Sequence, residues 1–365
     1  MKSGGFDVII GNPPYVELST ITKKYRPKNF ITEQCGNLYA LCTERSFTLQ
    51  NNNSRFGFIV QQPITSTIRM TLCRQIISKY SSFIWASTYD DRPSKLFDGM
   101  HHARLAIIIT KRNSLKLLTT FESSCLYVTR YNKWFKEERD YVFHKLDFIR
   151  STTDKLLDIF PKFSTDKEIQ IIDKLFKCPD KLGSWTTNNN PTYQLYYKIT
   201  GVGNWFTITP RPPKFFRSGE ESSSTRENQI AFFSEKVRDL AFCIFNSTLF
   251  YWFYQIRTNC RDFNPSDYKT FPVPNPNFLA EENMSFLADQ LRKRLDESTE
   301  IIAASHSITG AIKYEKFRPK TAKFIIDQID TALAKHYDFT TEELDFIINY
   351  DIKYRMGRDA GSEEE

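Results

Sequence analysis

The tetrapeptide Asn12-Pro13-Pro14-Tyr15 combines residue types whose order could do chemistry. It directly follows residues 6–10 (FDVII), a largely apolar run that predicts a buried parallel strand. In an open α/β sheet, loops at the carboxyl ends of strands form the ligand site. The two prolines fix φ and remove two backbone donors, so carbonyl acceptors remain beside the Asn12 side-chain oxygen and the Tyr15 ring. Such a group suits a flat amine with two N–H bonds to satisfy.

The elements that position this loop are predicted from the alternation of apolar patterns. Strand and helix patterns alternate over the first 120 residues, which indicates an α/β domain. Strands are expected at residues 6–10, 56–60, 83–88 and 104–110. Helices are expected at residues 37–50, with Asn37 as the N-cap, and at residues 67–80. Further on we expect helices at 167–176, 235–255, 280–305 and 318–348, short aromatic strands within 184–213, and an exposed loop at 218–224.

Composition excludes several classes of protein. The 365 residues are 40% hydrophobic and 15% aromatic, which is ample for a buried core and fits two domains. No apolar run reaches the roughly 20 residues of a bilayer span, and no secretory leader precedes the first strand. The seven cysteines form no CxxC pair, which indicates free thiols in a reducing cytoplasm. The pair His101-His102 lacks neighbouring ligands, so no metal is predicted.

Charge is unevenly distributed along the chain. Residues 1–120 hold 16 Lys and Arg against 7 Asp and Glu, and residues 121–280 hold 22 against 18. Residues 281–365 are acidic, with 12 against 18. A basic front and middle suit a polyanion such as nucleic acid, while ordinary solvated surface is the alternative.

The segment FDVIIGNPPYV resembles the catalytic motif of S-adenosylmethionine-dependent methyltransferases that act on amino groups. It is most similar to the adenine-N6 DNA type of restriction-modification systems. Later segments of the chain resemble, in the same order, segments of restriction-modification adenine methylases and of the large single-chain methylase-endonucleases. The matching stretches are GNLYAL with Glu44-Arg45, RFGFIV at 55–60, KLFDG with the strand at 104–110, FNSTLFYWFYQIRTNCRDFNPSDYKTFPVP at 245–274, and TEELDFIINYDIKYR at 341–355. No PD…ExK nuclease pattern is found, so DNA cleavage is not predicted.

The resemblance implies a role for each residue of the motif. The target adenine would be flipped out of the duplex. The Asn12 side-chain oxygen and the Pro13 carbonyl would accept its two N6 hydrogens, with Pro14 holding the bend. Tyr15 would stack on one face of the base and Phe97 on the other, although Phe97 could equally be a core aromatic. The methyl donor would be S-adenosylmethionine, which Asn12 would also contact, and no metal is needed.

The resemblance also implies a DNA-recognition region after the catalytic domain. Five basic residues there are candidates for contacts with phosphates or base edges, although each taken singly fits a solvated charge: Arg211, Lys214, Arg217, Arg257 and Arg261. The aromatic helix at 242–254 is expected to be a packed core face, because large aromatic side chains dominate cores.

The sequence departs from the family where the cofactor would bind. A strand with a Gly-rich turn normally precedes the catalytic motif, whereas eleven residues precede Asn12 here. The strand at 6–10 should then become an apolar sheet edge, which favours association. We therefore expect a second polypeptide that supplies the cofactor-binding strands, or a remnant of a split gene.

Together these features predict an α/β fold in four parts. Residues 1–120 would form a partial Rossmann-like methyltransferase sheet, 121–280 an α+β DNA-recognition domain, 281–358 a helical C-terminal segment and 359–365 a disordered tail. The predicted function is site-specific methylation of adenine N6 in double-stranded DNA, in the cytoplasm. One alternative is a non-catalytic DNA-binding remnant or specificity subunit. Another is a glutamine-directed protein methyltransferase, against which the long aromatic region at 180–280 argues.

Overall fold

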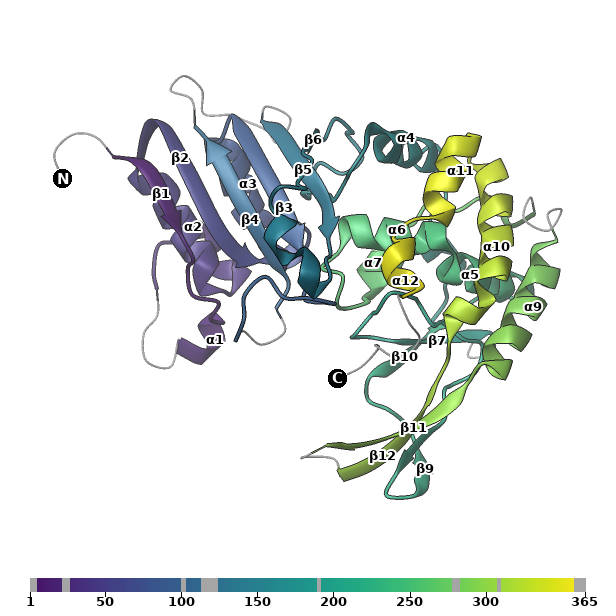
Figure 1. Ribbon diagram of the computed structural model, residues 1–365. Coiled ribbons are helices and arrows are strands. Elements are labelled where there is room, and N and C mark those ends of the chain that lie inside the picture. Colours follow the sequence, from purple (N-terminus) through teal and green to yellow (C-terminus); the bar gives the residue numbers. More distant parts are fainter. Residues whose placement is uncertain are drawn as a thin grey trace. The chain divides into compact units, whose positions relative to one another are not determined.

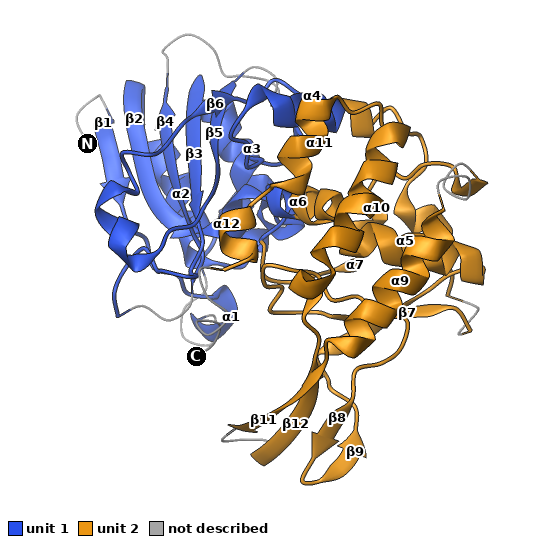
Figure 2. Cartoon of the chain, turned by 45° about the vertical axis from the view of Figure 1, so that its right-hand side comes forward, with its two compact units in different colours: residues 1–173, 255–259 blue, residues 174–254, 260–365 orange. Residues whose placement is uncertain are grey.

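The computed structural model describes residues 5–21, 27–99, 103–112, 124–188, 192–277, 283–306 and 310–357. The chain forms two compact units, residues 1–173 with 255–259 and residues 174–254 with 260–365 (Figure 2). By its contacts, the stretch from 121 to 173 groups with the first 120 residues, while the domain boundaries themselves stay a prediction. No helix among the described residues has the length and apolarity that a membrane crossing requires.

The first unit is built on a six-stranded mixed sheet with the order β1-β2-β4-β3-β5-β6 (Figure 1). The strands are β1 (Phe6–Gly11), β2 (Gln50–Gln61), β3 (Phe83–Tyr89), β4 (Leu105–Lys111), β5 (Cys125–Asn132) and β6 (Ile149–Arg150). β1 runs parallel to β2 and β3 parallel to β5, whereas β4 is antiparallel to both its neighbours. The four strands expected from the sequence are thus confirmed, within a mixed sheet.

β1 lies at the edge of this sheet. Among the described residues it pairs with β2, and three of its apolar side chains are exposed: Phe6, Val8 and Ile10, the last by 82%. The prediction of a parallel strand is correct, whereas the prediction that this strand is buried is wrong. The apolar sheet edge expected at this strand is confirmed.

Two helices cover one face of the sheet, α2 (Leu38–Leu49) and α3 (Thr71–Tyr80) (Figure 1). Asn37 caps α2 as predicted, because its side chain accepts a hydrogen bond from the Tyr39 amide. The remaining short elements of this unit are α1 (Leu18–Ile21), η1 (Ile31–Cys35), η2 (Gln62–Thr65), η3 (Ile68–Met70) and η5 (Lys136–Tyr141), and α4 (Asp166–Leu175) follows them. The helix expected at 67–80 begins only at Thr71, because residues 68–70 form η3, in which Ile68 is 76% exposed.

The second unit packs aromatic helices beside two small sheets. Its helices are α5 (Glu235–Asn246), α6 (Thr248–Arg257), α7 (Pro265–Lys269), α9 (Met284–Glu297), α10 (Lys323–His336), α11 (Thr341–Ile348) and α12 (Ile352–Arg355), with η6 (Leu182–Trp185) and η7 (Pro319–Ala322). The predicted aromatic core helix is confirmed as α5 and α6, whose seven aromatic side chains are at most 1% exposed: Phe242, Phe245, Phe250, Tyr251, Trp252, Phe253 and Tyr254.

The β structure of the second unit corrects two predictions. β7 (Gln194–Lys198) pairs with β10 (Glu227–Ala231), and a four-stranded antiparallel sheet has the order β11-β12-β8-β9. Its strands are β8 (Phe215–Arg217), β9 (Glu220–Ser222), β11 (Glu300–His306) and β12 (Gly310–Lys316). The C-terminal segment is therefore not all helical, since the helix expected to reach residue 305 ends at Glu297. The loop expected at 218–224 is the β8–β9 hairpin.

Gly36 illustrates how tightly the segment after β1 is held. Its φ is +66°, and a Cβ built there would lie 1.7 Å from Arg69 Nη2. We expect Gly36→Ala to destabilise the first unit by about 1–3 kcal/mol, because the left-handed backbone is strained for alanine and Arg69 must move. Denaturant unfolding would measure this, and Gly219→Ala, at φ +91° with open space around the Cβ, separates backbone strain from the clash. Equal losses in the two variants would contradict a role for Arg69.

Candidate active site

The Asn12–Tyr15 tetrapeptide lies at the carboxyl end of β1, as the sequence predicted. Asn12 and Pro14 are exposed, Pro13 is buried and Tyr15 is half-buried. Neither the Asn12 side chain nor the Pro13 carbonyl is hydrogen-bonded to any residue that the structure describes. Neither oxygen is therefore engaged by the residues that the structure describes, and their role as acceptors stays a prediction.

A short β-bridge fixes the chain just after the tetrapeptide. The Leu38 amide donates to the Val16 carbonyl and the Leu18 amide to the Gly36 carbonyl, each at 2.9 Å. The Glu17 carboxylate accepts from the Asn37 side chain at 3.3 Å and from Arg69 at 2.6 Å. The loop is thereby attached to the start of α2, so the capping residue of that helix also orients the motif.

Tyr15 is anchored at both ends of its side chain. Its hydroxyl donates to the Ile59 carbonyl at 3.1 Å, and its ring meets Tyr39 edge-on, with centroids 6.3 Å apart. Burial raises the pKa of Tyr15 to about 12, so the hydroxyl stays protonated and keeps donating. The ring is thereby held in one orientation, and the residue stays partly exposed.

Phe97 lies in the loop that follows β3, at the same edge of the sheet. The register pairs Gln61 of β2 with Leu105 of β4, Leu105 with Tyr89 of β3, and Tyr89 with Asn132 of β5. The carboxyl ends of β2, β3 and β5 and the start of β4 therefore share the edge where β1 ends. Phe97 is 36% exposed, which excludes the alternative of a core aromatic.

A small apolar core, here called the edge cluster, joins Tyr15 to the loop of Phe97. Its buried members are Tyr89, Leu96, Leu105, Trp134 and Val142. Tyr15 packs against this cluster, and Leu96, the residue before Phe97, belongs to it. Tyr15 and the residue that precedes Phe97 therefore contact one apolar cluster, while the stacking roles of Tyr15 and Phe97 stay a prediction.

The five basic candidates of the predicted recognition region lie in two separate stretches of chain, and Arg257 groups with the first unit. Arg211, Lys214 and Arg217 lie in or just before β8, whereas Arg257 ends α6 and Arg261 follows it. Lys214, Arg217 and Arg261 are exposed, and Arg261 is 4.0 Å from the Asp262 carboxylate. Their role in DNA binding stays a prediction.

Arg211 is engaged within its own unit. Its guanidinium makes two parallel hydrogen bonds to Glu315, at 2.7 and 2.8 Å, and a third to Asp296 at 2.9 Å. These contacts raise the pKa of Arg211 and hold the pKa of Glu315 below its usual range, with the Arg211 hydrogen bonds as the largest cause for Glu315. The arrangement favours a structural role in which Arg211 connects β12 to the end of α9.

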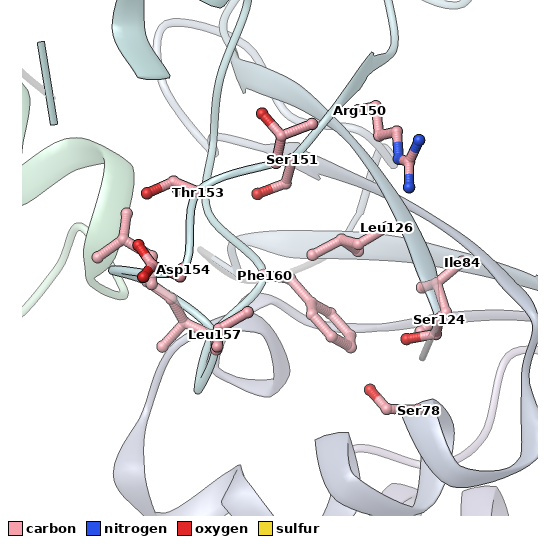
Figure 3. Close-up of a pocket in the computed structure, with 13 residues that line it drawn as sticks. Ser78, Ile84, Ser124, Leu126, Arg150, Ser151, Thr153, Asp154, Leu157 and Phe160 are labelled. Atoms are coloured by element: carbon pink, nitrogen blue, oxygen red, sulfur yellow. The ribbon is translucent and has the colours of Figure 1, made fainter. Parts of the chain in front are cut away.

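A cavity of about 260 Å³ lies elsewhere in the first unit (Figure 3). Ser78, Ile84, Leu126 and Phe160 line it, close to the amino ends of β3 and β5. The register places these amino ends at the sheet edge opposite to the tetrapeptide. The cavity is therefore separate from the candidate active site.

The described residues contain no group of three or more potential metal ligands, and the pair His101-His102 lies outside them. They also contain no Gly-rich turn at the end of a strand beside β1. The described residues therefore do not form the cradle for S-adenosylmethionine that the resemblance implies.

Sequence reasoning missed the charged residues that surround the edge cluster. Asp90 and Arg104 form a buried ion pair, Lys133 lies beside them, and Arg139 contacts the Phe97 loop. These residues come from four separate stretches of chain, and no local pattern links them. The one available signal was the position of Asp90 and Arg104 at the two ends of the loop between predicted strands.

The family model described as Eco57I restriction-modification methylase matches residues 1–89. No curated protein matches the chain. Among solved structures, the chain is similar to the Type IIL restriction-modification enzyme MmeI in complex with DNA, with 14% identity over 96% of this chain and 57% of that one, at a TM-score of 0.49.

Two further solved structures are similar over much of the chain. A nuclease-deletion mutant of the Type ISP restriction-modification enzyme LlaGI with a DNA substrate mimic shares 10% identity over 84% of this chain and 46% of that one, at a TM-score of 0.41. The type IIG restriction endonuclease BpuSI shares 9% identity over 94% of this chain and 54% of that one, at a TM-score of 0.31. The chain therefore spans about half the length of the solved structures that it matches. The region that the family model matches, residues 1–89, contains the tetrapeptide.

Proposed function

We propose that this chain carries the target-amine side of an adenine-N6 DNA methyltransferase of a restriction-modification system. The observation that carries the proposal is the pair of available acceptors at Asn12 and Pro13, beside an anchored Tyr15 ring, at the carboxyl end of β1. The six-stranded sheet would be part of a Rossmann-like methyltransferase sheet acting in the cytoplasm. Residues 121–280 would contain the DNA-recognition region, and 281–358 a C-terminal segment that supports it.

The side chains of this unit would act by position and polarity. The Asn12 oxygen and the Pro13 carbonyl would accept the two N6 hydrogens of a flipped adenine, which turns the nitrogen lone pair out of conjugation with the ring. Tyr15 and Phe97 would hold the base plane so that this lone pair points at the incoming methyl group. S-adenosylmethionine, when bound, supplies that methyl group as a sulfonium. Asn12 would also contact this cofactor.

The cofactor cradle would come from strands beside β1. Val8 and Ile10, which share one face of β1, expose 60% and 82% of their surface, and a further strand would pair with the backbone edge of β1 that lies away from β2. A second polypeptide, or chain beyond the sequence given, would supply these strands. Calorimetric titration with S-adenosylmethionine tests this: we expect no binding by the chain alone and binding once the upstream reading frame is expressed with it. Binding by the chain alone would contradict it.

The methylation itself is tested by tritium transfer from labelled S-adenosylmethionine to long unmethylated DNA of mixed sequence, followed by identification of the modified base. We expect N6-methyladenine from the complete assembly. A complete assembly that binds DNA and cofactor and transfers no methyl group would favour the alternative of a DNA-binding remnant or specificity subunit. Binding to duplex DNA that weakens steeply with salt would exclude the glutamine-directed alternative.

Phe97 provides a prediction about base stacking. We expect Phe97→Ala to lower methyl transfer by the assembly about 5- to 150-fold, because stacking of one base on an aromatic ring is worth about 1–3 kcal/mol. Phe148→Ala is the matched control, since Phe148 is 37% exposed and Phe97 36% exposed in the same unit. Equal effects of the two substitutions on the transfer rate would contradict a stacking role for Phe97.

A further inference from the structure

The loop between β3 and β4 is tied at both of its ends by charge. The Asp90 carboxylate, one residue after β3, accepts a hydrogen bond from Arg104 Nε at 2.9 Å, one residue before β4. The same nitrogen lies 3.4 Å from Asp91, and Lys133 Nζ lies 3.9 Å from Asp90. Two carboxylates and two cations therefore meet where the loop leaves and re-enters the sheet.

These four side chains are largely removed from water, with exposures of 16% for Arg104, 9% for Asp91, 7% for Asp90 and 3% for Lys133. Burial alone would raise the pKa of Asp90, but the attraction of Arg104 and Lys133 outweighs it and lowers the pKa. Removing charges from water costs about as much as their attraction returns, so buried ion pairs add little net stability. What such a group can do is fix the geometry of the segments that it joins.

Arg139 holds the middle of the same loop. Its Nη2 donates to the Leu96 carbonyl at 2.7 Å, and its guanidinium lies 5.9 Å from the centre of the Phe143 ring. The Leu96 carbonyl belongs to the peptide that leads into Phe97, so this bond sets the direction in which the Phe97 side chain leaves the backbone. The Leu96 side chain is meanwhile buried in the edge cluster against which Tyr15 packs.

We propose that Arg139, together with the Asp90–Arg104 pair, positions Phe97 as the second stacking face of the candidate active site. Arg139 is a positioning residue, since it acts through the Leu96 peptide. The inference rests on the proposed function for its purpose, whereas the ordering of Phe97 can be measured without any methyl transfer. It adds a third element, η5, to the β1 and β3 loops that form the site.

The ordering is tested with the complete chain carrying 4-fluorophenylalanine at position 97 and fluorine NMR. We expect Arg139→Gln to move the resonance of residue 97 toward its position in the urea-unfolded chain. Arg139→Lys, which retains a donor for the Leu96 carbonyl, should restore it at least in part. Lys145→Gln is the charge-matched control, because Lys145 lies near in sequence and contacts Glu138 and Tyr141. The melting temperature of each variant shows whether the fold is intact.

The outcome separates the inference from the proposed function. A resonance in Arg139→Gln identical to that of the parent chain overturns the inference, whether or not the assembly methylates DNA. A shifted resonance with a melting temperature equal to that of the control supports it. In the methylating assembly we then expect kcat to fall about tenfold or more while the KM for DNA stays near that of the control, since misplacement by about 1 Å can cost about 10²-fold. A changed KM with an unchanged kcat would contradict this positioning role.

Discussion

Asn12→Ala is expected to lower methyl transfer by the complete assembly about 10²–10³-fold, because it removes one of the two acceptors for the target amine. Deleting one preorganised polar group at the reacting centre of an enzyme has a cost of this size. The Asn12 side chain is exposed and has no hydrogen bond to any residue within the described ranges, so the fold should not change. The loss should therefore appear in kcat with an unchanged melting temperature. Tritium incorporation into unmethylated DNA measures the rate.

The control for this prediction is the same substitution at an exposed asparagine that lies outside the candidate active site. Asn228→Ala serves, since Asn228 is an exposed residue of β10 in the other unit. Asn12→Asp should retain more activity than Asn12→Ala, because a carboxylate oxygen still accepts a hydrogen bond. Methyl transfer by Asn12→Ala at the rate of the Asn228→Ala control would overturn the proposed function.

The parts of the site that the sequence revealed are those coded by neighbouring residues. An apolar run followed at once by Asn-Pro-Pro-Tyr defines both a strand and the loop at its end, because strand burial and proline geometry are local. The cap at Asn37 is similarly local. The exposed position of Phe97 was left open, since an aromatic residue near a turn is compatible with either a core or a surface role until its neighbours are known.

What the sequence could not reveal depends on pairs of residues far apart in the chain. Arg211 was a reasonable candidate for phosphate contact until Glu315, 104 residues later, was found to bind its guanidinium. The four-stranded sheet was missed for the same reason. β8 is three residues long and gains its partner from β12, while the apolar residues of β11 continue the pattern of the preceding helix. A short strand has too few residues to show an alternation of its own.

Arg355→Ala is expected to destabilise the second unit by about 3–5 kcal/mol, the cost of removing one partner from a buried charged group. Arg355 is 1% exposed, and its guanidinium lies 3.8 Å from the centre of the Trp205 ring and 4.8 Å from that of Tyr251. It also donates to the Thr248 hydroxyl and to the Asn204 carbonyl, each at 3.2 Å. The last helix, α12, is thereby attached to the aromatic core.

This loss should depend on pH through Asp330. Burial raises the pKa of Asp330 to about 6, while hydrogen bonds from the Thr248 and Leu249 amides and the charge of Arg355 act in the opposite direction. A carboxyl whose folded pKa is raised favours the folded state below its unfolded pKa near 4, and this contribution is lost as the pH rises through about 6. Without Arg355 the pKa of Asp330 rises further, so the variant should lose more stability at pH 8 than at pH 5.

Hydrogen exchange of peptides from α6 and α10 measures this loss in the second unit itself, which matters because a chain of two units need not unfold in one step. Lys353→Ala is the control, since Lys353 is an exposed cation of the same helix. Arg355→Lys should recover part of the stability, because it restores the charge without the flat guanidinium that stacks on Trp205. An equal loss at pH 5 and pH 8 would show that Arg355 acts through packing alone and does not stabilise the Asp330 carboxylate.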